Sequence, residues 1–144
     1  MSLLRSRDIK YIANENDTDA TSSYLINLQI LECGDNTKFT DKGIKQLTNL
    51  QELSCEFNKN FTDEGIKQLT NLQKLHCGYN TSNFTDEGIK QLTNLQELIC
   101  VYNTNFTDEG IKQLTNLQKL HCGYNKKITD KIIKHLPKLI IHRY

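Results

Sequence analysis

The hydrophobic and polar positions of the chain follow one pattern that occurs five times. In residues 50–58 the order is Leu, two polar residues, Leu, one polar residue, Cys, two variable residues and Asn. The cysteines of successive copies are 22, 22, 23 and 22 residues apart, and a fixed period in this range indicates a solenoid of stacked units. The cysteine and asparagine of the five copies are Cys33/Asn36, Cys55/Asn58, Cys77/Asn80, Cys100/Asn103 and Cys122/Asn125.

The first half of each copy predicts a short strand. Leu53 and Cys55 are two positions apart and therefore share one face of the strand, while Glu52 and Ser54 share the other. We expect the apolar face to pack inward and the polar face to point outward. Asn58 falls where the chain leaves the strand for an irregular, buried turn. Its carboxamide has the donors and acceptors that such a turn needs, so we interpret the asparagine column as structural.

The second half of each copy predicts a short helix. Thr62 is placed to cap its N-terminus, and Asp63 and Glu64 lie in the first turn, where the helix dipole favours anions. Ile66 and Leu69 are three positions apart and pack toward the strand. We therefore expect strands along one side of the solenoid and helices along the other.

This pattern resembles the leucine-rich repeat consensus, with cysteine in the third apolar position. The helical half, Phe61-Thr-Asp-Glu-Gly-Ile66-Lys-Gln-Leu69, resembles the cysteine-containing subfamily found in F-box proteins. Near-identical arrays also occur in proteins of amoebae and of the giant DNA viruses that infect them. The resemblance implies an α/β solenoid, a leucine-rich repeat horseshoe with a parallel concave β-sheet and short convex helices.

We expect a single domain whose end units differ from its interior units, because their outer faces meet water. The expected parts of residues 1–144 are a degenerate N-terminal capping repeat (1–24), five regular repeats (25–135) and a truncated C-terminal cap (136–144). Carrying the 22-residue register backward places Tyr11 in line with Cys33. Carrying it forward places His142 on the last strand, in line with Leu120.

Composition narrows the class of protein. The chain is 37% hydrophobic and 24% charged, and no apolar run approaches the roughly 18 residues that cross a bilayer. The start lacks a secretory signal, so we expect a cytoplasmic protein with no membrane partner. The formal net charge of +1 argues against a nucleic-acid partner. The two ends nevertheless differ, because residues 1–35 carry −3 and residues 126–144 carry +5.

Candidate chemistry is scarce. His76-Cys77 and His121-Cys122 each combine a base with a nucleophile, but adjacent residues of a strand point to opposite faces, so neither dyad closes. Cysteines stacked about 4.8 Å apart in a line do not converge on a tetrahedral zinc ion. We therefore expect buried free thiols, no catalytic residues, no metal, no cofactor and no enzyme activity.

Outward residues of successive strands form columns. One runs Ile30, Glu52, Lys74, Glu97 and Lys119, and its alternating charges stabilise a sheet by a few tenths of a kcal/mol per pair. Beside the asparagines, a second column runs Asp35, Phe57, Tyr79, Tyr102 and Tyr124. The aromatic side chains are either an interaction surface or a stack that rigidifies the turns. His76 and His121 are expected to be exposed, with pH-dependent binding as an option.

We expect a protein-interaction scaffold that binds another protein on the concave face of the sheet. The candidate contact residues are Glu52, Ser54, Phe57, Lys74, His76, Tyr79, Glu97, Ile99, Tyr102, Lys119, His121 and Tyr124. The alternative is a structural or self-assembling protein that stacks head to tail through its oppositely charged ends, with the strand near Ile141 as an unpaired edge. Either way we expect a monomer or weak self-association.

Overall fold

The structure is a computed structural model that describes residues 9–35, 38–79 and 83–143. Over these residues strands and helices alternate, and the strands form one parallel sheet in sequence order. The strands are β1 (Lys10–Ile12), β2 (Ile30–Glu32), β3 (Glu52–Ser54), β4 (Lys74–His76), β5 (Glu97–Ile99), β6 (Lys119–His121) and β7 (Ile140–His142). The helices are α1 (Asp19–Ser22), α2 (Asp41–Ile44), α3 (Asp63–Ile66), α4 (Asp86–Ile89), α5 (Asp108–Ile111) and the 3-10 helix η1 (Asp130–Lys134).

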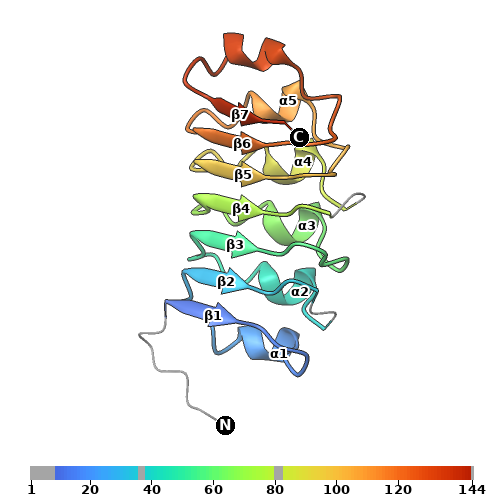
Figure 1. The fold of residues 1–144 in the computed structure, drawn as a ribbon. Coiled ribbons are helices and arrows are strands. Elements are labelled where there is room, and N and C mark those ends of the chain that lie inside the picture. Colours follow the sequence, from blue (N-terminus) through green and yellow to red (C-terminus); the bar gives the residue numbers. More distant parts are fainter. Residues whose placement is uncertain (1–8, 36–37, 80–82, 144) are drawn as a thin grey trace.

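Figure 1 shows the strands stacked along one side and the helices along the other, in an open sheet that does not curl. This arrangement confirms the predicted solenoid. The core lies between the two sides and repeats from unit to unit. Around β3, the side chains of Leu53, Cys55, Phe61, Ile66 and Leu69 are each no more than 1% exposed. Because every unit buries the same set against its neighbours, the units share one continuous hydrophobic core.

The cysteines are buried and free, as predicted. Burial raises the pKa of the Cys33 thiol to about 12. It also raises the pKa values of the Cys55, Cys77 and Cys100 thiols above the ordinary range. Because the thiolate is the nucleophilic form, these side chains act as small packing residues rather than as reactive groups.

The asparagine column holds the turn that follows each strand. Asn103 is fully buried, its side-chain amide donates to Phe84 O, and its oxygen accepts from the backbone N–H groups of Asn105 and Phe106. Asn58 and Asn125 are buried in the same position. The structural interpretation is thus confirmed for these three residues, whereas Asn36 and Asn80 lie outside the described residues.

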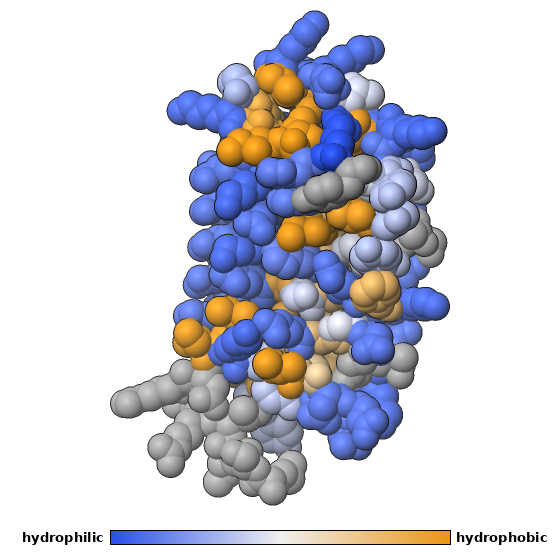
Figure 2. Space-filling model, in the orientation of Figure 1, coloured by the Kyte–Doolittle hydropathy of each residue, from blue (hydrophilic) through white to orange (hydrophobic). Residues whose placement is uncertain are grey.

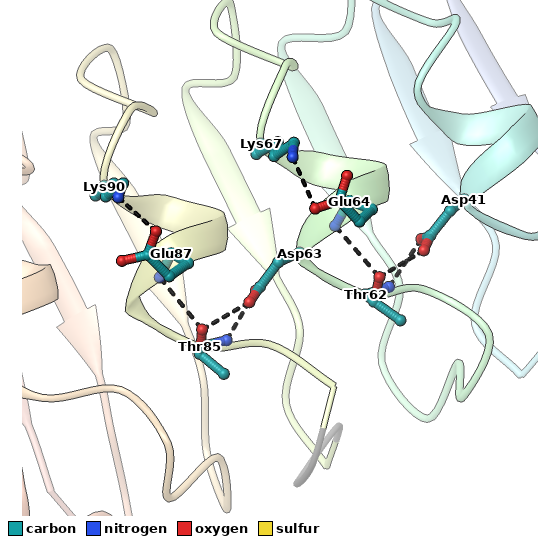
Figure 3. Close-up of polar contacts among 8 residues, drawn as sticks. All are labelled: Asp41, Thr62, Asp63, Glu64, Lys67, Thr85, Glu87 and Lys90. Atoms are coloured by element: carbon teal, nitrogen blue, oxygen red, sulfur yellow. Dashed lines mark hydrogen bonds and ion pairs between the residues drawn. The ribbon is translucent and has the colours of Figure 1, made fainter.

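Each helix is tied to the next by the carboxylate of its first residue. Asp63 accepts hydrogen bonds from the N–H (2.9 Å) and the hydroxyl (2.6 Å) of Thr85 in the following unit. The Thr85 hydroxyl in turn accepts from the N–H of Glu87 (3.2 Å) and so caps α4, as Figure 3 shows. We call this series the Asp–Thr ladder. Its other pairs are Asp19–Thr40, Asp41–Thr62, Asp86–Thr107 and Asp108–Thr129.

A glycine in each of the helices α2 to α5 leaves room for the carboxylate of the preceding helix. A Cβ on Gly88 would lie 2.2 Å from Asp63 Oδ1 and 3.1 Å from Asp63 Cα. The same relation holds for Gly43, Gly65 and Gly110. In the last unit Ile132 replaces the glycine, and there the segment forms the 3-10 helix η1, with Ile132 fully buried in the core. The altered helix therefore accommodates the larger side chain.

The first strand corrects the predicted register. Tyr11 pairs with Leu31 rather than lying in line with Cys33. Ala13 takes the position that was predicted for Tyr11, and Asn14 follows it directly. The first unit thus lacks the two turn residues that separate cysteine from asparagine in later units. A constant 22-residue step fails where a unit is shortened.

The last strand also corrects the predicted register. Ile141 pairs with Leu120, and His142 pairs with His121, so the final unit is one residue shorter than the regular period. The physical reason is burial. Ile141 packs against the hydrophobic core, whereas the predicted register would have turned an imidazole inward.

Candidate functional site

The outward side chains of the strands and of the turns that follow them form three columns, which we call the sheet face. The first column contains Lys10, Ile30, Glu52, Lys74, Glu97, Lys119 and Ile140. The second contains Ile12, Glu32, Ser54, His76, Ile99, His121 and His142. The third, at the turns, contains Phe57, Tyr79, Tyr102 and Tyr124. The twelve predicted contact residues all belong to these columns.

The charged residues pair differently from the simple alternation that the sequence predicted. Lys74 Nζ lies 2.8 Å from Glu52 Oε1, and this hydrogen bond raises the pKa of Lys74. Glu97, however, accepts from His76 of the second column at 3.2 Å. Lys10 likewise reaches diagonally to Glu32 at 2.7 Å. The pairs are partly exposed and contribute little stability, and their charges remain at the surface.

The aromatic side chains of the third column are in direct contact, and we call them the aromatic ladder. Ring centroids are 4.5 Å apart between Phe57 and Tyr79, 4.9 Å between Tyr79 and Tyr102, and 4.2 Å between Tyr102 and Tyr124. A hydrogen bond with Tyr124 raises the pKa of Tyr102. Phe57 is 51% exposed, Tyr79 45% and Tyr124 58%. The rings therefore stack on one another, and all but Tyr102, which is only partly exposed, leave about half of the residue surface in contact with solvent.

The backbone of the aromatic ladder is left-handed, which the sequence analysis missed. The φ angles of Phe57, Tyr79, Tyr102 and Tyr124 lie between 62° and 64°. Bulky residues rarely adopt this conformation, and it costs on the order of 1–3 kcal/mol per residue. In this conformation each ring stacks on the ring of a neighbouring unit. The signal available in the sequence was the fixed position of the aromatic residue directly before the structural asparagine.

A pair of histidines lies at the end of the second column. The rings of His121 and His142 stack with centroids 4.3 Å apart. Desolvation lowers the pKa of His121, His142 lowers it further, and Glu97 acts in the opposite direction. Sequence analysis missed this pair because it placed His142 in line with Leu120. An inward position needs an apolar side chain, and that requirement would have selected Ile141 and brought the two histidines together.

The chemistry of the sheet face suits surface contact. Next to His76, the Cys77 thiol is fully buried with a raised pKa and so is a poor nucleophile. Among the described residues, no three His, Cys, Asp or Glu side chains are grouped to hold a metal ion. Between β2, β3 and β4 the face has a hollow of about 70 Å³, well below the roughly 300–1,000 Å³ of small-molecule pockets. In the described part of the chain, no helix has the length and apolarity to span a bilayer.

No protein-family model and no curated protein matches the chain. Solved structures do resemble it. An internalin of Listeria monocytogenes has a TM-score of 0.68 and 26% identity over 87% of this chain. Internalin C2 of the same bacterium has a TM-score of 0.64 and 25% identity over 92% of this chain. A leucine-rich repeat protein of Leptospira interrogans has a TM-score of 0.52 and 30% identity over 83% of this chain.

The chain spans 37% of the first internalin, 69% of internalin C2 and 38% of the Leptospira protein. The regular units, the parallel strands and the short helices are those of these neighbours, and together they define a solenoid of leucine-rich repeats. The chain thus has the fold of a leucine-rich repeat solenoid.

Proposed function

We propose that the protein is an interaction scaffold that binds another protein on its sheet face. Tyr79, Tyr102 and Tyr124 act as the anchors, and the charged columns beside them set specificity. The observation that carries this proposal is the aromatic ladder, whose rings are stacked in a row, with Phe57, Tyr79 and Tyr124 about half exposed and Tyr102 partly exposed. The likeness to leucine-rich repeat structures supports an interaction scaffold in general.

The ladder suits recognition because its rings are already ordered. Aromatic side chains supply large contact areas, and side chains that are fixed before binding lose little entropy when a partner arrives. Each ring is confined by its neighbours and by a left-handed turn. The adjacent Glu52–Lys74 and His76–Glu97 pairs offer charges of both signs within reach of the same partner.

The test replaces the anchors without disturbing the turns. Asparagine tolerates the left-handed conformation, so Tyr79→Asn, Tyr102→Asn and Tyr124→Asn together remove the rings while the backbone keeps its path. We expect this variant to lose the partner that the wild-type protein captures from native extract, as measured by quantitative mass spectrometry. The matched control is Glu64→Ala, Glu87→Ala and Glu109→Ala, three equivalent exposed residues on the helix side.

The two variants separate the possible outcomes. Loss of the partner in the asparagine variant alone supports binding on the sheet face. Full retention in a folded asparagine variant contradicts the proposal, and loss in the control alone assigns the partner to the helix side. Circular dichroism and the urea midpoint show whether each variant is folded.

A further inference from the structure

The two ends of the solenoid expose apolar side chains that its middle does not. Among the described residues, the large hydrophobic side chains that are exposed outside the aromatic ladder all lie at one end or the other. They are Ile9, Ile12, Tyr24 and Ile26 near the start, and Ile133 and Ile140 near the finish. Figure 2 shows hydrophobic surface near both ends and a further patch between them. Exposed apolar groups of this kind mark contact surfaces.

The same two ends carry opposite charge. A hollow at the N-terminal end is lined by Ile12, by the carboxylates of Glu15, Glu32 and Asp35 and by Lys38; since Glu32 pairs with Lys10 at 2.7 Å, Glu15 and Asp35 carry the acidic character. It lies at the shortened turn of the first unit, where two residues of the regular turn are missing. At the other end the exposed lysines are Lys126, Lys127, Lys131, Lys134 and Lys138.

The hollow and the lysine-rich loop lie on the same edge of the sheet. Lys126 and Lys127 follow the asparagine turn after β6, and Asp35 belongs to the corresponding turn after β2. β1 and β7 are the outermost strands of the described sheet. A second copy placed in line with the first would therefore bring a lysine-rich turn toward an acidic one.

The Asp–Thr ladder of the helix side does not extend from one copy to the next. In the ladder the N–H of Thr18 would donate to a carboxylate of a preceding unit. Here it already donates to Thr21 Oγ1 at 3.1 Å. At the other end, Asp130 lies 3.2 Å from Arg143. The Asp–Thr ladder is thus closed at both ends by groups of the same chain. Contact between copies has to rest on the charged turns and the exposed apolar residues, which makes it weak and sensitive to salt.

We propose that copies of this chain associate head to tail, with the lysine-rich C-terminal end of one against the acidic N-terminal end of the next. The contact is heterologous, because the two surfaces are different parts of the molecule. Association therefore does not stop at a dimer and grows with protein concentration. It is separate from partner binding on the sheet face, which uses the interior units.

Sedimentation velocity over a range of protein concentrations provides the test. At an ionic strength of about 0.01 M we expect the mean sedimentation coefficient to rise steadily with concentration, and at about 1 M, where charges are screened beyond about 3 Å, to return toward the monomer value. Two charge-reversal variants are then compared: Glu15→Lys with Asp35→Lys, and Lys126→Glu with Lys127→Glu. Each alone should weaken association roughly tenfold or more, because like charges then meet.

Mixing the two variants in equal amounts should restore association, because the reversed N-terminal end of one meets the reversed C-terminal end of the other. Glu64→Lys with Glu87→Lys is the control, since it makes the same change in net charge on the helix side and should leave association as in the wild type. A wild-type monomer at every concentration in low salt overturns the proposal. So does a plateau at the dimer, or a mixture that associates no better than its components.

Discussion

The helix side and the sheet face are built from the same repeating units but differ in how strictly they repeat. On the helix side, Asp, Thr and Gly make the same contact from unit to unit, with Asp63, Thr85 and Gly88 as the example. On the sheet face, corresponding positions hold Ser54, His76, Ile99 and His121. The comparison teaches that contacts between units set the fold, while positions facing solvent are free to differ.

The largest effect is expected from removing one carboxylate of the Asp–Thr ladder. Asp86→Ala deletes the acceptor of the Thr107 N–H (2.9 Å) and of the Thr107 hydroxyl (2.6 Å). Hydrogen bonds to charged groups contribute about 1.5–3 kcal/mol each, so we expect loss of the two to lower the free energy of unfolding by about 3–6 kcal/mol. Urea unfolding followed by circular dichroism measures the loss. Glu87→Ala, which removes only a surface ion pair with Lys90, should lower the free energy of unfolding by less than about 1 kcal/mol. Equal losses in Asp86→Ala and Glu87→Ala would contradict the special role of the ladder.

A smaller effect is expected from filling the space beside that carboxylate. In Gly110→Ala the new Cβ would lie 2.1 Å from Asp86 Oδ1 and 2.8 Å from Asp86 Cβ. The steric cost of about 1–3 kcal/mol equals or exceeds the gain of roughly 1 kcal/mol in helix propensity, so the variant should be less stable by up to about 2 kcal/mol. In an Asp86→Ala background the contact with Oδ1 is removed but the contact with Cβ remains, so the same change should cost less than it does in the wild type. A double-mutant cycle in urea tests this, and additive losses would show that the contact is not direct.

On the sheet face, a single ring matters less. Tyr102→Asn removes stacking against Tyr79 and Tyr124, which we expect to lower the free energy of unfolding by about 0.5–1.5 kcal/mol. Tyr102→Ala should cost more than Tyr102→Asn, because alanine fits the left-handed backbone less well. Thermal and urea unfolding of both variants give the order. The reverse order would mean that backbone conformation does not limit the turn.

The smallest effect concerns the His121–His142 stack. Because the pKa of His121 is lowered in the folded protein, the unfolded chain binds its proton at a higher pH, near the ordinary value of about 6.5. The stability that neutral His121 contributes is therefore present above this pH and is lost as the pH falls below it. The free energies of unfolding of the wild type and of His121→Asn should therefore become more alike as the pH falls from about 7 to about 5. Curves that stay parallel would show that the imidazole is not desolvated.

The fold was predictable because its signals are local. The two-residue spacing of Leu53 and Cys55 and the three-residue spacing of Ile66 and Leu69 indicate the strand and the helix within one unit, and the period then stacks the units. The columns of the sheet face were predictable from the same period, because corresponding residues of neighbouring interior strands pair with each other.

What the sequence did not reveal lies between units or at the ends. Asp63 reads locally as a helix-dipole residue, and nothing near it indicates that its partner is Thr85 in the next unit. The left-handed turn of Tyr102 depends on stacking with rings in two other units. Ile141 replaced His142 as the inward residue because burial outweighs a constant repeat length.

The buried cysteines divide the solenoid at regular intervals. Each unit from Cys33 to Cys122 has one thiol that is closed to solvent while its unit is folded. In a linear array units open separately, so the order in which these thiols react with an alkylating reagent traces how unfolding spreads along the chain. The cysteines thereby provide one reactive site in each regular unit with which local unfolding can be followed.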